Sequence, residues 1–132
     1  MSEWFVDSNY FVRLLQGDIP EQQAEAARFF HRAATGKLNA YTSALVFFEV
    51  YWVISRSYSV EKERCIVLLQ GILDMSFLRI EERDLLEESL SLFGESSVQL
   101  QDCYNLLYAR KRSGDGHLAT FDKALLKLAN RE

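Results

Sequence analysis

The stretch that decides the fold reads Glu3-Trp4-Phe5-Val6-Asp7-Ser8-Asn9. Its apolar run ends at a carboxylate, which is followed by residue types that commonly cap helices. We therefore expect a short buried strand over residues 3–6 and a short helix over residues 10–15, which Gly17 ends. A strand followed at once by a helix is the repeating unit of α/β folds.

The rest of the chain alternates in the same way between short apolar runs and helical patterns. Further strands are expected over residues 38–41, 76–80 and 117–120. Further helices are expected from Pro20 to about Thr35, from a cap at Thr42 or Ser43 to about Arg56, from a cap at Ser59 to about Leu73, and over residues 81–93, 100–112 and 123–129. This order predicts a parallel sheet in an α/β layer fold, with functional sites beyond the carboxyl ends of the strands.

The length and composition are those of one globular domain, which we expect to span residues 1–132. Apolar residues make up 48% of the chain, so a core can form without disulfides or structural zinc. No disulfide is expected between Cys65 and Cys103, and the two histidines and two cysteines show no zinc-binding spacing. The net charge of -4 does not suggest a general nucleic-acid coat, although local basic patches could meet phosphates.

We expect a cytoplasmic protein with no membrane partner. The start of the chain lacks the basic region of a signal peptide. The longest apolar stretch, residues 44–54, is too short to span a bilayer and contains Glu49.

Four carboxylates lie at the ends or in the interiors of apolar elements, and these are Asp7, Glu49, Asp102 and Asp122. A carboxylate in apolar surroundings is costly unless it is paired, hydrogen-bonded or bound to a metal. Asp7 and Asp122 could simply cap helices. Glu49 could pair with a buried Arg or Lys, whereas Asp102 is a less natural cap because residues 100 and 101 belong to the same expected helix.

Together the four acids suggest one shared cation. Oxygen ligands without histidine favour Mg²⁺ or Mn²⁺ over zinc. A metal held by several carboxylates, with free coordination positions, can orient and activate a water for phosphodiester hydrolysis.

The motifs that hold these acids occur in a fixed order, Phe5-Val6-Asp7-Ser8-Asn9, then Thr42-Ser43-Ala44-Leu45-Val46-Phe47-Phe48-Glu49-Val50, then Gln101-Asp102, then Leu118-Ala119-Thr120-Phe121-Asp122-Lys123. In this order and spacing they resemble a PIN domain over the whole chain. The kind most similar is the VapC-like toxin ribonuclease of type II toxin–antitoxin pairs.

The resemblance implies a three-layer α/β/α fold with a short parallel sheet flanked by helices. It also implies a Mg²⁺- or Mn²⁺-dependent endoribonuclease whose catalytic, metal-binding acids are Asp7, Glu49, Asp102 and Asp122. Ser8, Asn9 and Thr120 match positions that orient these carboxylates. Many members carry a further acid where this chain has Gln99, so one metal could bind firmly and a second weakly or only with substrate.

The RNA contacts and partners are less sharply indicated. Basic residues near the candidate acids could meet phosphates or could simply be solvated, and they are Arg13, Arg110, Lys111, Arg112, His117 and Lys123. The helix over residues 44–54 is apolar nearly all round, so it lies in the core or in an interface. Members of the family commonly form homodimers and bury an antitoxin peptide near the site.

Two other functions compete with the nuclease. Phosphohydrolases with an aspartyl nucleophile need a second Asp where this chain has Asn9, which disfavours them. A degenerate PIN scaffold could bind RNA or protein without cleaving, which Gln99 favours and the four retained acids oppose.

Overall fold

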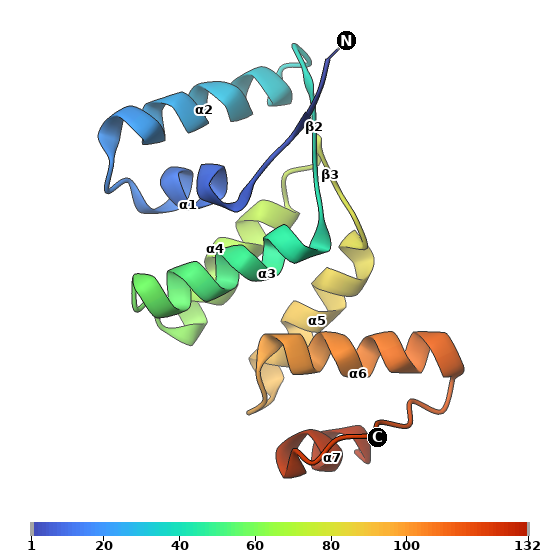
Figure 1. Ribbon diagram of the computed structural model, residues 1–132. Coiled ribbons are helices and arrows are strands. Elements are labelled where there is room, and N and C mark those ends of the chain that lie inside the picture. Colours follow the sequence, from blue (N-terminus) through green and yellow to red (C-terminus); the bar gives the residue numbers. More distant parts are fainter. Residues whose placement is uncertain (1, 132) are drawn as a thin grey trace. The chain divides into compact units, whose positions relative to one another are not determined.

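The computed structural model describes residues 2–131, and these form two compact units that meet in sequence between Glu82 and Arg83. The elements of the first unit are β1 (Glu3–Phe5), α1 (Ser8–Gln16), α2 (Pro20–Ala34), β2 (Asn39–Thr42), α3 (Ala44–Trp52), a π-helical turn η1 (Val53–Ser57), α4 (Lys62–Leu73) and β3 (Leu78–Ile80) (Figure 1). The elements of the second unit are α5 (Arg83–Glu95), α6 (Leu100–Ser113) and α7 (Lys123–Ala129).

The strands of the first unit form a parallel sheet in the order β1-β2-β3. Trp4 pairs with Ala40, and Ala40 pairs in turn with Leu78. One further bond, from the Val6 amide to the Tyr41 carbonyl at 2.8 Å, extends the first ladder beyond β1. The expected α/β class, with a short parallel sheet flanked by helices, is confirmed, and it is consistent with a three-layer α/β/α fold.

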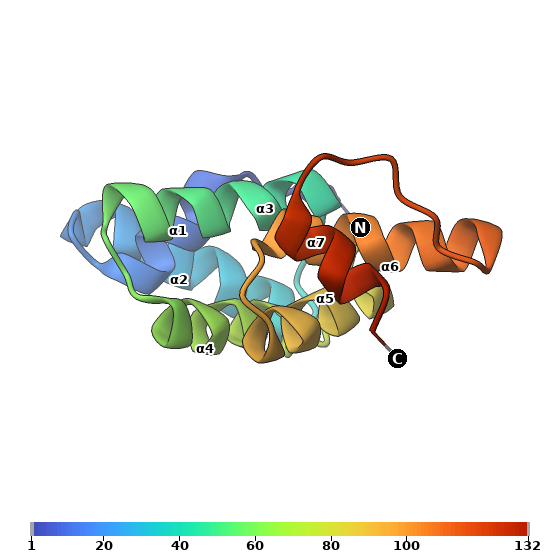
Figure 2. The ribbon, with the colours of Figure 1, turned by 90° about the horizontal axis from the view of Figure 1, so that it is seen from below.

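The helices of the first unit pack through aromatic and aliphatic side chains. α1 contacts α2 and α3, and α3 also contacts α4 (Figure 2). The rings of Phe11 on α1 and Phe30 on α2 lie 5.2 Å apart. On α3, Phe47 and Val50 are fully buried, so of the two placements that its apolar character left open, core or interface, the structure shows the core.

The regular secondary structure described in the second unit consists of helices. α5 packs against α6, and Leu90 on α5 and Leu106 on α6 are both fully buried. Arg110 on α6 donates a hydrogen bond from Nη2 to the Ala129 carbonyl at 3.2 Å, which ties the end of α7 to α6. Across residues 2–131, no helix combines the length and the hydropathy needed to cross a membrane.

The expectation of a buried first strand is wrong. β1 lies at one end of the strand order, and its side chains are exposed, with Trp4 at 52% and Phe5 at 49%. Trp4 contacts the ring of Phe29, and Phe5 contacts the ring of Tyr41, both in edge-to-face geometry. The apolar composition marked a strand but did not show its place at the edge of the sheet.

The strand expected over residues 117–120 is also absent, because the structure has no regular element between Ser113 and Lys123. Phe121 at the end of this segment is fully exposed. A strand needs a hydrogen-bonded neighbour, and no described strand pairs with this segment. A smaller difference concerns α4, which begins at Lys62 because Ser59 has a positive φ of 53° and cannot cap it.

Candidate metal centre

Asp7 lies just beyond β1 and is the N-cap residue of α1. Its Oδ1 accepts a 2.8 Å hydrogen bond from the Ser8 amide, and the side chain is exposed. The simple capping role is therefore real, but it does not compete with metal binding, because a carboxylate has further lone pairs.

The backbone before Asp7 is held from β2. The buried hydroxyl of Thr42 donates to the Val6 carbonyl at 2.7 Å. The Glu81 amide, just after β3, donates to the Thr42 carbonyl at 3.2 Å. These bonds fasten the carboxyl ends of the three strands to one another, at the edge where Asp7 follows β1.

Glu49 lies on α3, which packs against α1 within the same unit. Its side chain is half-buried, between the buried Phe48 and Val50. No cation of residues 2–82 pairs with it, so the structure gives no support within this unit for a buried ion pair. Glu49 is thus a partly desolvated carboxylate without a counter-charge from its own unit.

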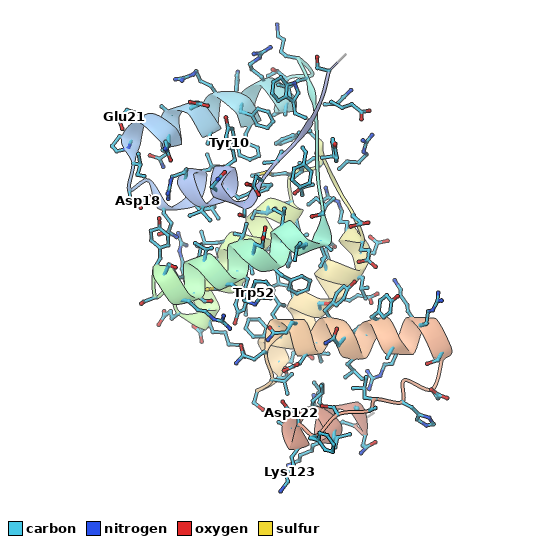
Figure 3. All side chains as sticks on the ribbon, in the orientation of Figure 1. Tyr10, Asp18, Glu21, Trp52, Asp122 and Lys123 are labelled. Atoms are coloured by element: carbon cyan, nitrogen blue, oxygen red, sulfur yellow. The ribbon has the colours of Figure 1, made fainter. Side chains whose placement is uncertain are left out.

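Asp102 and Asp122 belong to the second unit. Asp102 is half-buried in the first turn of α6, inside the helix as expected. Asp122 is the N-cap of α7, and its Oδ1 accepts from the Leu125 amide at 3.0 Å (Figure 3). Thr120 Oγ1 accepts from the Asp122 amide at 3.1 Å, so Thr120 contacts the backbone of this acid and not its carboxylate.

Ser8 and Asn9, which were also expected to orient carboxylates, lie near Asp7 in different ways. Ser8 meets it through its backbone amide, not its hydroxyl. Asn9 lines, together with Asp7, a cavity of about 270 Å³ whose other lining residues are Val6 and four aromatic residues. Gln99 is the N-cap residue of α6 and makes no side-chain cap bond.

The candidate acids therefore fall two to each unit, with Asp7 and Glu49 in the first and Asp102 and Asp122 in the second. Within the described part of the chain, no group of three or more Asp, Glu, His or Cys side chains is close enough to hold a metal. The donor chemistry nevertheless fits Mg²⁺, which proteins often hold with only one or two carboxylates besides water and substrate phosphate.

One acid at the strand ends escaped the sequence analysis. Glu81 follows β3, and its Oε1 accepts from the Ala44 amide at 3.5 Å, at the N-terminus of α3. A carboxylate at this end of a helix is stabilised by the helix dipole. Only the pairing of β3 with β2 reveals this position, because the sequence around Glu81 reads as an ordinary charged helix start.

Three of the six candidate RNA contacts have partners within the protein. Arg13 donates from Nε to Gln22 at 2.7 Å and from Nη1 to the Tyr58 hydroxyl at 2.8 Å. Arg110 donates to the Ala129 carbonyl. Lys111, Arg112 and Lys123 are exposed, and so is His117, which lies 3.6 Å from Asp115.

Comparison with known families supplies one match. A family model described as the PIN domain matches residues 4–131, which is nearly the whole chain. No curated protein and no solved structure is similar enough in sequence to be matched with the chain.

Proposed function

The chain belongs to the PIN domain family, and from this premise we propose that it is a Mg²⁺- or Mn²⁺-dependent endoribonuclease. PIN domains are usually nucleases, and they typically use divalent metals, so a nuclease role in general is supported by the family match. The more specific proposal is that the substrate is RNA. It rests on the resemblance of the motifs around the four acids to the VapC-like ribonucleases.

The acids proposed to hold the metal are Asp7, Glu49, Asp102 and Asp122. The observation that carries this assignment is the state of Glu49, a half-buried carboxylate with no counter-charge from its own unit. A cation bound beside such a group is screened less by water than one at an exposed carboxylate, so the pair is stronger.

The chemistry divides between metal and protein. The metal, when bound, would lower the pKa of a water and offset charge on the scissile phosphate. The carboxylates would fix the position of the cation, and an acid left free of it could accept a proton from the attacking water. Thr120 would hold the backbone at Asp122, and Ser8 the carboxylate of Asp7, through the bonds described above.

We further propose that the protein is the toxin of a toxin–antitoxin pair and forms a homodimer. An antitoxin would lay an apolar peptide beside the acids and reach them with an Arg, whose planar fork matches carboxylates. Such an inhibitor would compete with metal. Inhibition should then weaken as Mn²⁺ is raised, whereas inhibition independent of Mn²⁺ would point to steric blockage of RNA entry.

The alternative is a scaffold that binds RNA or protein without cleaving it, and Gln99 in place of an acid favours this alternative. Cleavage of single-stranded RNA with Mn²⁺ and with EDTA, by the wild type and by Asp7→Asn, separates the two. Asn is as good an N-cap as Asp, so the variant should fold normally. We expect Mn²⁺-dependent cleavage that Asp7→Asn abolishes. Full activity in a well-folded Asp7→Asn protein would remove Asp7 from the site, and no wild-type cleavage with Mn²⁺ would favour the scaffold.

A further inference from the structure

A cavity of about 380 Å³ in the second unit lies apart from the residues assigned above. One wall is the end of α5 and the loop that follows it, with Glu95, Ser96 and Ser97. The other wall is formed by α7 and the residues after it, with Lys127 and Arg131. Two basic residues and two serines thus line one hollow, against a single acidic residue, and the Ser96 hydroxyl also lies 3.6 Å from Cys103 Sγ.

The cations of this cavity are free to meet a ligand. Neither Lys127 nor Arg131 forms an ion pair or a side-chain hydrogen bond with any residue that the structure describes. Glu95 has no such partner there either, so it does not neutralise them directly. The charge of the lining sums to +1 in a chain whose net charge is -4. This is a local basic site on an acidic protein.

The chemistry of the lining selects a phosphate. Arg and Lys are the common phosphate-binding cations, and hydroxyl groups add hydrogen bonds to phosphate oxygens. The lining has no aromatic ring on which a base could stack, so it suits the backbone of a nucleic acid better than a base.

We propose that this cavity binds a backbone phosphate of the RNA strand, close to the phosphate that is cleaved. This proposal rests on the proposed function for the identity of the ligand. Its geometric basis is α7, because Asp122 caps this helix and Lys127 follows five residues later. At a rise of about 1.5 Å per residue, the two positions lie roughly 7–8 Å apart along the helix. The two positions also lie about 140° apart around the helix axis, so a strand held at Lys127 would pass around α7 to reach Asp122.

The test measures RNA binding without catalysis. Labelled single-stranded RNA is titrated in EDTA, by fluorescence anisotropy, at several salt concentrations. The test variant is Lys127→Gln/Arg131→Gln, and the charge-matched control is Arg28→Gln/Lys37→Gln, which alters exposed cations of the first unit. Thermal melts followed by circular dichroism verify that both variants fold.

We expect the test variant to bind about tenfold more weakly at low salt and to lose about 0.7 from the slope of log Kd against log salt, which corresponds to one single-strand phosphate contact. The control should change affinity by less than about twofold. Equal effects in the two variants would show general charge attraction and overturn the proposal. So would an unchanged affinity in a folded test variant.

A second arm separates RNA from free phosphate. Inorganic phosphate should shift the amide NMR signals of Ser96 and Ser97 in the wild type and not in the test variant. Phosphate binding together with an unchanged RNA affinity would overturn the RNA assignment. Because both arms exclude the metal, loss of the nuclease function would leave the result on this cavity standing, and the reverse also holds.

Discussion

The buried hydroxyl of Thr42 donates a 2.7 Å hydrogen bond to the carbonyl of Val6, the residue immediately before Asp7. Thr42 closes β2, and Val6 follows β1, so a single side chain fixes the backbone from which a candidate metal ligand departs. The position of Asp7 therefore depends on a residue that would never meet the metal.

The change Thr42→Val keeps the side-chain shape and removes this donor. We expect it to cost about 1–3 kcal/mol in the free energy of unfolding, because the Val6 carbonyl loses a buried partner. Mn²⁺-dependent cleavage should fall further than this stability loss explains. Urea unfolding and cleavage rates at saturating Mn²⁺ measure the two effects. Thr35→Val, at an exposed site, is the matched control and should shift stability by no more than about 0.5 kcal/mol. Equal stability losses at the two positions would contradict the role of Thr42.

The change Glu49→Gln tests whether this carboxylate repels other acids or pairs with a cation. Removing an unpaired, partly desolvated charge should raise the melting temperature of the metal-free protein and abolish cleavage. If a basic side chain does pair with Glu49, the same change leaves that side chain without a counter-charge and lowers the melting temperature. Thermal unfolding in EDTA decides between repulsion by other acids and pairing with a cation. The control is Glu87→Gln on α5, which neutralises an exposed acid.

The acid sensitivity of the first unit should depend on Tyr58. Its hydroxyl donates to Asp18 at 2.6 Å, and this bond is the main cause of the lowered pKa of Asp18. A carboxyl whose pKa falls on folding adds stability above its unfolded value, about 3.8, and loses it as the pH falls through the lower folded pKa. Tyr58→Phe should therefore narrow the gap in unfolding free energy between pH 7 and pH 3. Urea unfolding across this range measures it, with Tyr108→Phe as the control. Parallel pH profiles for wild type and Tyr58→Phe would refute this role.

Both cysteines should resist thiol reagents in the native protein. Cys65 and Cys103 are free and fully buried, and burial raises the pKa of the Cys65 thiol, which lowers the share of reactive thiolate. Ellman's reagent at pH 8 should react only slowly with the folded protein. In urea, where the protein is unfolded, it should react with both thiols. Reductant should leave the melting temperature unchanged. Rapid reaction of one thiol in native buffer would show an opening that the structure does not contain.

The sequence was most informative where a single residue type determines local geometry. Capping by Asp7 and Asp122 and the end of α1 at Gly17 follow from local chemistry, and all three are found. Gly17 has a φ of 66°, which other residues adopt only at a cost. The core position of α3 is one of the two placements that its apolar composition left open, and both cysteines are free.

Sequence reasoning failed where the result depends on distant partners. Trp4 is exposed because β1 lies at the edge of the sheet. Residues 117–120 are irregular because no described strand forms backbone hydrogen bonds with them. Neither property is encoded in the residues themselves. The same limit hid the cavity at Lys127 and Arg131, because a lysine or arginine near a helix end is usually just solvated.

The caps on α1 and α7 have a consequence for the entropy of metal binding. Asp7 and Asp122 each hold a backbone amide through Oδ1, so their rotamers are restricted before any cation arrives. A ligand that is already ordered loses less conformational freedom on coordination. The same local bonds that begin these helices would thereby raise the affinity for the metal without adding a single contact to it.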